Sequence, residues 1–443
     1  MTVAIIGIMI LLILMLMGMN IGICMMAVGF FGCLATYVMV RGMDFSRALS
    51  ASLIVFQKVP FTQATQYSFV VIPLFVLMGQ LCYYSGMSAG LYNLAEKWLG
   101  SLRGGLAMAT VVACALFGAI CGSSAATAAT MCVVALPAMR EHGYDDSLSC
   151  GSIAAGGTLG ILIPPSTSFI LYGIITGESV GKLFAAGIIP GIILAICFCI
   201  TIFIMCKVNP KLAPEAVKYP MRDKVRSLGG GLPMVILFAV VIGGILTGYF
   251  TAVEASAIGA VLSFIYLLIR RKFSFKVLMD SLRETVKTSG MMFLILIGAY
   301  VFGQFLTATN LPNTLATFVQ GLDVNRYIIL IIILVIYAVM GCLMDSLPMV
   351  LLTAPIFYPI MTQTLGFDGI WYGVIMVLVM QLGLITPPVG MNVYIISGIA
   401  KDVPLQRIFK GTAPMIIGLI AAVVIVTIFP QTATWLASFV TSS

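Results

Sequence analysis

The chain has 443 residues, of which 61% are hydrophobic and only 9% are charged. This composition excludes a soluble globular protein and predicts an all-α polytopic membrane protein without a separate soluble domain. The formal net charge of +8 does not indicate nucleic-acid binding, because lysine and arginine gather at 207–226 and 270–287, between apolar runs.

Cysteine and histidine offer no pattern that predicts catalysis or metal binding. The eleven cysteines form no Cys-x-x-Cys pair, and most lie inside apolar runs, so we expect neither disulfides nor a transition-metal site. The single histidine, His142, lies in a polar turn beside Glu141 and Asp145, where a solvated side chain is expected. We therefore predict no catalytic residue and no cofactor.

Residues 1–207 are predicted to form a first structural unit. In chain order, it is expected to contain scaffold spans within 1–41 (near 3–23 and 25–41), an arm at 44–58, a span near 68–85, a hairpin at 104–140, a broken helix at 148–176 and a span near 184–206. The hairpin is interrupted at Cys121-Gly122-Ser123-Ser124, and each of its arms is too short to cross a bilayer comfortably. A re-entrant hairpin is the expected result.

Two adjacent prolines, Pro164 and Pro165, interrupt the helix expected at 148–176. They remove two backbone donors and clash with the preceding turn, so the helix must break there. At membrane depth such a break is tolerated only where it is buried in protein or lines a cavity. The same passage recurs in the second half of the chain, at Pro387-Pro388. Paired interrupted helices of this kind point to a transporter's binding site.

A second unit, at 229–443, is predicted to repeat the first after a cytoplasmic loop at 208–228. Its expected elements are scaffold spans within 231–271, an arm at 273–289, a span near 290–308, a hairpin at 326–363 broken around Met344-Asp345-Ser346, a broken helix at 370–400 and a span near 411–430. Glycine matches, such as Gly118 with Gly341, keep nearly one register across both units, which chance is not expected to supply.

The two units are expected to be inverted relative to each other. Five crossings per unit is an odd number, so the second unit would begin on the opposite side of the membrane from the first. Eighteen of the 23 lysines and arginines then fall on one face, and five fall on the other: Arg41, Arg47, Lys58, Lys182 and Arg326. The richer face is predicted to be cytoplasmic, which places both termini outside the cytoplasm.

Two hairpin tips and two helix breaks would meet near the midplane, where freed carbonyl oxygens suit a small hard cation and helix N-termini suit an anion. The first predicted sodium site contains Gly122, Ser123, Ser124, Ile163, Pro164 and Ser166. The second contains Asp345, Ser346, Thr386, Pro387 and Gly390. The residues predicted to contact the substrate are Ser124, Thr127, Ser168 and Asn392.

Each polar residue also has a simpler structural interpretation. Ser123 and Asp345 could be no more than N-caps of the second hairpin arms, although capping and ion binding can coexist. Asp345 is the strongest candidate, because a carboxylate at membrane depth normally marks an ion or proton path. For Glu254, at the start of a span, the structural interpretation is favoured. Glu178 and Asp402 are expected to be solvated turn residues.

One span begins with Thr251-Ala-Val-Glu254-Ala, which resembles the Thr-x-x-Glu-Ala signature of the large membrane subunit of TRAP (tripartite ATP-independent periplasmic) transporters. The tip at 121–128 and both Pro-Pro breaks also resemble that family, and the likeness covers essentially the whole chain. One departure is Ala252, where the family commonly has proline.

This resemblance implies a sodium-driven importer of organic acids in the bacterial inner membrane, working by an elevator mechanism. Its implied partners are membrane lipid, a separate small membrane subunit and a periplasmic binding protein, which would dock near Arg326 on the far side. Sialic acids, dicarboxylates, sugar acids and keto acids all remain possible substrates.

Three other functions stay open on the sequence alone. A stand-alone sodium/organic-anion symporter would share the same core and need no binding protein. An ion channel would need rings of carbonyls or charges along a pore, which two closed hairpins do not suggest. An intramembrane hydrolase would need a base beside Ser123, whereas the only histidine lies in a loop.

Overall fold

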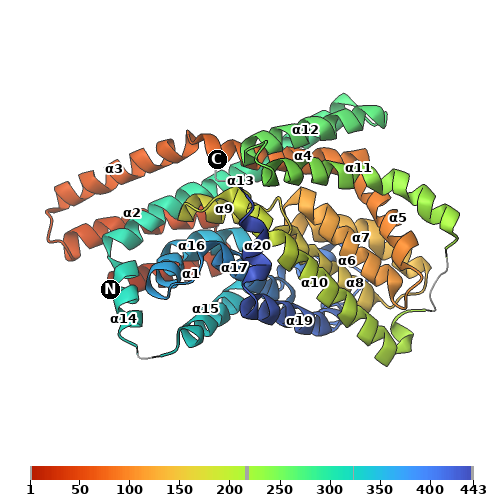
Figure 1. Ribbon diagram of the computed structural model, residues 1–443. Coiled ribbons are helices and arrows are strands. Elements are labelled where there is room, and N and C mark those ends of the chain that lie inside the picture. The colour runs from red at the N-terminus through yellow and green to blue at the C-terminus, as the bar shows by residue number, and fades with distance from the viewer. Residues whose placement is uncertain (1, 215–218, 323, 441–443) are drawn as a thin grey trace.

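The structure is a computed structural model that describes residues 2–214, 219–322 and 324–440. Within these ranges the secondary structure is helical, and no strand occurs. In Figure 1, α3, α4, α11, α12 and α13 run along the upper edge of the molecule, above most of the remaining helices.

The helices of the first unit are α1 (Thr2–Leu16), α2 (Ile21–Met39), α3 (Phe45–Ala64), η1 (Tyr67–Val70), α4 (Val71–Ser85), α5 (Met87–Leu99), α6 (Gly105–Cys121), α7 (Ser124–Glu141), α8 (Asp146–Thr158), η2 (Leu159–Ile161), α9 (Thr167–Thr176) and α10 (Val180–Val208). After η3 (Pro210–Leu212), those of the second are α11 (Met221–Leu246), α12 (Ala252–Ile269), α13 (Phe275–Ala308), α14 (Leu311–Gln320), α15 (Arg326–Gly341), α16 (Ser346–Pro359), η4 (Ile360–Thr364), α17 (Gly369–Ile385), α18 (Met391–Ile399), α19 (Leu405–Ile428) and α20 (Gln431–Ala437).

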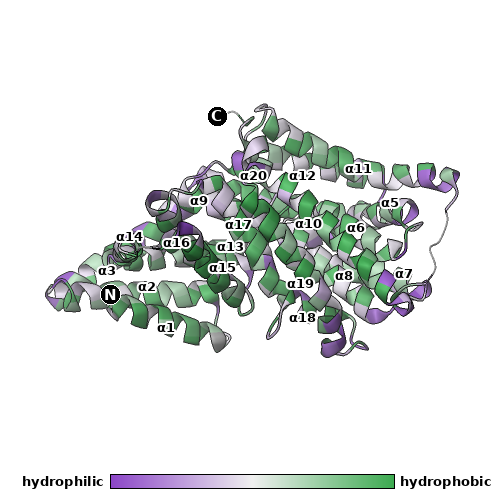
Figure 2. Cartoon of the chain, turned by 60° about the horizontal axis from the view of Figure 1, so that its bottom comes forward, coloured by the Kyte–Doolittle hydropathy of each residue, from purple (hydrophilic) through white to green (hydrophobic). Residues whose placement is uncertain are grey.

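Hydrophobicity divides the helices into long spans and shorter segments. Among the described residues, seven helical segments are long and apolar enough to cross a membrane: α2, η1 with α4, α10, α11, α12, α13 and α19. Figure 2 shows hydrophobic residues along these helices and hydrophilic residues mainly at their ends and in the connections. The hairpin arms α6, α7, α15 and α16 have only 14 to 18 residues each.

Contacts between the two units are reciprocal. Helix α2 packs on α13 while α12 packs on α4, and α8 packs on α19 while α17 packs on α10. The second hairpin arms follow the same rule, because α7 contacts α18 and α16 contacts α9. Reciprocal contacts of this form are the pattern that a two-fold axis produces between two similar units.

Equivalent glycines bring each hairpin close to its own broken helix. A Cβ atom added at Gly118 would lie 2.5 Å from Gly160 Cα, and one at Gly383 would lie 2.0 Å from Gly341 C. Small residues allow helix backbones to approach closely in membranes. Because Gly341 and Gly383 are the counterparts of Gly118 and Gly160 in the repeat, the same close contact occurs once in each unit.

Helices α1 and α13 have different bounds from those expected. Helix α1 ends at Leu16 instead of continuing to 23, since Gly18 (φ +79°) turns the chain and Asn20 caps α2. Its 15 residues span about 22 Å, which is less than the bilayer core of about 30 Å. The arm at 273–289 continues directly into the next span, because the only glycine near the junction, Gly290, does not stop the 34-residue helix α13.

In the first unit the corresponding arm and span are separated. Helix α3 contains Pro60 and ends at Ala64, and η1 then leads into α4. The predicted cytoplasmic loop is also shorter than expected, since α11 begins at Met221 directly after Pro220. Helices α5, α14 and α20 were not expected from the sequence.

Candidate functional site

The first hairpin tip is a two-residue turn between helices. Gly122 ends α6 in the left-handed region (φ +62°), and Ser123 is extended and caps α7 by accepting a hydrogen bond from Ala126 N at 3.4 Å. The Thr127 hydroxyl donates to the Ser123 carbonyl at 2.7 Å. The tip therefore presents the N-terminus of α7 with Ser123 half-buried at its start.

The first helix break lies directly against this tip. Pro164 and Pro165 are joined by a cis peptide bond, and Ser166 caps α9 by accepting a hydrogen bond from Phe169 N. The Thr167 hydroxyl donates to the Gly122 carbonyl at 2.8 Å. A Cβ atom on Gly122 would lie 2.8 Å from the Pro165 carbonyl oxygen, so glycine permits the close approach. The structure thus brings the two segments of the first predicted sodium site together.

The second tip and break are joined more loosely. Asp345 caps α16, and its carboxylate accepts hydrogen bonds from the Ser346 amide at 2.7 Å and the Ser346 hydroxyl at 3.3 Å. Thr386 donates to Leu382 O at 2.5 Å. Among the described residues, no hydrogen bond joins Asp345 or Ser346 to Thr386, so the glycine packing described above is what holds this tip near its break.

The two breaks also differ in exposure. Pro164 and Pro165 are buried, as expected for a break inside protein, whereas Pro387 and Pro388 are exposed on this chain. Gly390 begins the next half-helix in the left-handed region (φ +59°). The first predicted cation site is therefore enclosed by this chain, and the second lies at its surface.

A buried hydrogen-bond chain connects the first tip to the second broken helix. The Ser124 hydroxyl donates to Asn392 Oδ1 at 2.9 Å, and Asn392 Nδ2 donates to the Ala154 carbonyl at 2.9 Å. Both side chains are at most 3% exposed. Because their polar atoms already have partners inside the protein, Ser124 and Asn392 act here as positioning residues between the two units.

None of the four residues predicted to contact substrate lines a cavity at the tip. Ser124, Thr127, Ser168 and Asn392 are all buried, and the Ser168 hydroxyl has no hydrogen-bond partner in the structure. Instead, a cavity of about 320 Å³ lies beside the tip, with α7 on one side and α4 and α13 on the other. Its polar lining comes from Gln80, Tyr83, Ser123, Thr130, Thr167 and Thr288.

Sequence reasoning missed most of this lining. Gln80 lies in the span expected near 68–85 and Thr288 in the arm expected at 273–289, and neither residue was predicted to line a site. A signal for Gln80 existed, because Gly79-Gln80-Leu81 matches Gly303-Gln304-Phe305 in the second unit. No comparable pattern marks Thr130 or Thr288.

Ionic contacts join the two units where the hairpin and the broken helices end. Arg140, at the end of α7, pairs with Asp146 at 2.7 Å and with Asp402 at 2.6 Å. Arg407, in α19, pairs with Asp145 at 2.8 Å. The hydrogen bond from Arg140 holds the pKa of Asp402 below its ordinary value. Asp402 is therefore paired across the units, not simply solvated as expected.

An equivalent connection lies at the opposite end. Tyr358, at the end of α16, donates a hydrogen bond to Glu178 Oε1 at 2.7 Å, and Tyr172 donates to the Gly369 carbonyl at 2.6 Å. Glu178 and Asp402 follow the two broken helices at corresponding positions of the repeat. Each carboxylate is thus held by the hairpin of the other unit, and the expectation that Glu178 is only solvated was wrong.

Glu254 and Arg326 have local partners. Glu254 and Thr251 form a capping box, with Thr251 N donating to Glu254 Oε2 at 2.8 Å, which agrees with the structural interpretation. Arg326, at the start of α15, lies over the rings of Tyr327 and Phe367, at 5.2 and 5.0 Å from their centroids. Arg326 also lines a small surface pocket of about 120 Å³.

Comparisons with known proteins agree with this architecture. The family described as "Tripartite ATP-independent periplasmic transporter, DctM component" matches residues 8–432. A C4-dicarboxylate TRAP transporter large permease protein of Pseudomonas aeruginosa is 35% identical over 371 residues, which are 84% of this chain and 86% of that protein. The sialic acid TRAP transporter large permease protein of Vibrio cholerae is 29% identical, over 82% of this chain and 85% of that protein.

Among solved structures, the YdaH transporter of Alcanivorax borkumensis, described as having an unusual topology, is similar in fold. It has a TM-score of 0.59 at 14% identity, and the match covers 86% of this chain and 89% of that chain. The relatives of this chain are named as permeases, not as enzymes. The chain belongs to the DctM family and is the large permease component of a tripartite ATP-independent periplasmic transporter.

Proposed function

We propose that this chain imports a small organic acid together with sodium ions, by an elevator form of alternating access. The observation that carries the proposal is the cavity beside the first hairpin tip. Ser123 and Thr167, at the starts of α7 and α9, both line it, so two helix N-termini reach the same space. Its lining includes no lysine or arginine. The positive ends of two helix dipoles and several hydroxyl groups would then bind a carboxylate.

The two sodium sites remain part of this proposal. The first would use the oxygens of Gly122, Ser123 and Ser124 with those of the break at 163–166. The hydrogen bond from the Thr167 hydroxyl to the Gly122 carbonyl supports this proposal. The second would use Asp345 and Ser346 with Thr386, Pro387 and Gly390. Oxygen ligands without thiolate or imidazole suit an alkali cation better than a transition metal.

Family membership implies a multi-pass protein of the bacterial inner membrane that works with a small membrane subunit and a periplasmic binding protein. We propose that the binding protein delivers the substrate and docks near Arg326. The named relatives transport C4-dicarboxylates and sialic acid, according to their names, and both of these substrates carry carboxylates. We therefore propose a carboxylate as the substrate class. The excess of basic residues at 207–226 and 270–287 supports a cytoplasmic location for those segments and periplasmic termini.

The proposed motion separates two groups of helices. The moving body would contain the hairpins α6–α7 and α15–α16 and the broken helices α8–α9 and α17–α18. The frame would contain α1–α4 and α11–α13. The reciprocal contacts support an inverted repeat, and the Ser124–Asn392 bond and the Arg140–Asp402 pair support a single moving body, since each joins elements of both units.

Uptake into proteoliposomes tests the proposal. The chain, reconstituted with its small subunit, should accumulate a labelled organic acid only with both an inward sodium gradient and its binding protein. Uptake that needs sodium but no binding protein would instead identify a stand-alone symporter. Non-saturating flux that needs neither would identify a channel, and both results would contradict the proposal.

A further inference from the structure

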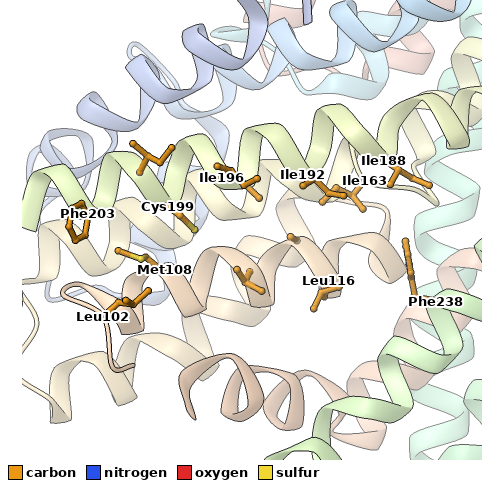
Figure 3. A pocket seen from close by; sticks show the side chains of 14 residues that line it. Leu102, Met108, Leu116, Ile163, Ile188, Ile192, Ile196, Cys199, Phe203 and Phe238 are labelled. Carbon is orange, nitrogen blue, oxygen red and sulfur yellow. The ribbon is translucent and has the colours of Figure 1, made fainter. Parts of the chain in front are cut away.

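A long apolar groove lies apart from the cavity beside the first hairpin tip. It has a volume of about 570 Å³ and lies between α6 and α10. In Figure 3, Leu102 and Phe203 lie at one end, and Ile163, Ile188 and Phe238 lie at the other. All fourteen lining side chains are apolar or cysteine. Ordered water needs polar partners, so such a groove favours an apolar occupant.

The groove has the length and position of a lipid chain. Phe203 and Ile188 lie about four turns apart on α10, which corresponds to about 22 Å along the helix. One leaflet of the hydrocarbon core is about 15 Å thick, so the groove is long enough to hold an acyl chain from one leaflet. Three groove residues on the same helix, Ile192, Ile196 and Ile200, are each about half exposed. The groove is therefore open at the molecular surface along α10.

Two cations lie at the outer end of this groove. A Cβ atom on Gly104 would lie 2.7 Å from Cys206 Sγ, so the start of α6 touches the end of α10. Arg103 and Lys207 flank this contact, next to the groove residues Leu102 and Phe203. Both cations are exposed, and among the described residues neither forms an ion pair. An apolar groove that ends at two exposed cations matches an acyl chain attached to a phosphate.

We propose that the groove binds a phospholipid, with one acyl chain between α6 and α10 and the phosphate held by Arg103 and Lys207. The charged end faces the cytoplasm in the proposed orientation, so the lipid would belong to the inner leaflet. The acyl chain would contact α6 of the moving body, Phe238 of the frame and Ile163 beside the first break. The bound lipid would thus lie between parts that move relative to each other.

Lipid titration followed by native mass spectrometry tests this proposal. The full-length chain is purified with its small subunit in a mild detergent, and dioleoyl phosphatidylglycerol is added stepwise. Ala195→Trp, which fills the groove, should weaken binding about tenfold, the effect of about 1.4 kcal/mol. Ala421→Trp, on the exposed face of α19, is the matched control and should bind as the unchanged protein does.

The charged end is tested in the same titration. Arg103→Ala combined with Lys207→Ala should also weaken binding about tenfold, because two phosphate contacts are lost. Arg270→Ala combined with Arg271→Ala removes two exposed cations on the same proposed face and should have no effect. Equal binding by the groove variants and their controls would overturn the proposal.

Labelling of Cys199 gives a second measurement that does not depend on those variants folding normally. Cys199 lines the groove, and the other ten cysteines can be replaced. Added phosphatidylglycerol should slow the reaction of Cys199 with a maleimide about tenfold, which corresponds to a free energy of lipid binding to the groove of about 1.4 kcal/mol. An unchanged labelling rate would show that the groove holds no phospholipid. A zero-length cross-link between Cys199 and the small subunit, formed in the same yield with and without added lipid, would show the same.

Discussion

Ser123 combines a structural and a proposed ionic role in one side chain. Its hydroxyl accepts one amide hydrogen bond as the cap of α7, and a hydroxyl oxygen has a second lone pair for a cation. Ser123→Ala should raise the sodium concentration for half-maximal uptake about tenfold, which corresponds to a loss of about 1.4 kcal/mol. Ser152→Ala, which removes a buried hydroxyl from α8, is the control. An unchanged sodium dependence in the folded Ser123 variant would leave Ser123 as a cap only.

Asp345 has the same double role, with a full charge. Asp345→Asn keeps the shape and the capping oxygen but removes the negative charge. Loss of a charged ligand weakens the electrostatic attraction for a cation, so we expect the half-saturating sodium concentration to rise tenfold or more, which corresponds to about 1.4 kcal/mol or more. The Asp44→Asn variant changes an exposed cap of α3 and should transport normally. Normal transport by the Asp345 variant at limiting sodium would remove this residue from the ion site.

Arg326 is held by aromatic rings at a surface pocket, with its charge available to a docked partner. Arg326→Glu should slow uptake at low concentrations of binding protein and restore it at high concentrations, because a charge at the rim of an interface mainly changes the rate of encounter. An equal reduction at every concentration would place Arg326 in folding or gating. No effect would move the docking surface elsewhere.

At the scale of single residues, the sequence identified which polar residues lie at the site but not what each of them contacts. It found Ser124 and Asn392 because both are polar residues near a break. It could not show that they bind each other, since they lie far apart in the chain and only the packing of α7 on α18 brings them together. Glu254 could be interpreted correctly because a capping box is local in sequence.

At the scale of the elements, Arg140 joins the first hairpin to the second broken helix. Arg140→Ala and Asp402→Ala should each lower the melting temperature in detergent by a few degrees. The double variant should lose little more than Arg140→Ala alone, because Arg140→Ala already removes the pair with Asp402 as well as the one with Asp146. Additive losses would show that the two residues act independently.

Acidification offers an independent test of the same pair. Arg140 depresses the pKa of Asp402 below its ordinary value of 3.8 in the folded protein. A depressed pKa contributes stability that is present above the ordinary value and is lost as the pH falls through the folded value. The difference in melting temperature between the unchanged protein and Asp402→Asn should therefore begin to shrink as the pH falls below 3.8 and disappear only below the depressed pKa of the folded protein. A difference that persists unchanged in acid would contradict the assigned charge interaction.

Helix ends were predictable wherever a local signal exists. The Pro-Pro breaks and the tip at Gly122-Ser123 lie where the sequence placed them, because prolines, glycines and caps act through their neighbours. The continuity of α13 was not predicted, since an amphipathic arm and an apolar span differ in composition without a residue that ends the helix. Helix α1 was predicted too long because its apolar character continues past Gly18.

At the scale of the whole molecule, the recurrence of the Pro-Pro break and of the matching glycines predicts two equivalent units. Helices at corresponding positions of these predicted units contact each other reciprocally. The sequence could not show which face of each helix meets the other unit, so it missed the cavity between the tip and the scaffold. Thr130 of the proposed moving body and Thr288 of the proposed frame both line that cavity.

Cross-linking of this pair tests the central claim, that one body carries the site past a fixed frame. In a variant without native cysteines, Thr130→Cys and Thr288→Cys are introduced together and treated with a short bifunctional thiol reagent. We predict efficient cross-linking in one condition and strong loss of it in another, when sodium and a transport inhibitor are added or removed. A pair within the frame, the native Cys82 of α4 kept together with Ser263→Cys in α12, should cross-link equally in all conditions, because the Cys82 Sγ and Ser263 Oγ atoms lie 3.3 Å apart. Equal cross-linking of the Thr130 and Thr288 positions throughout would contradict the account.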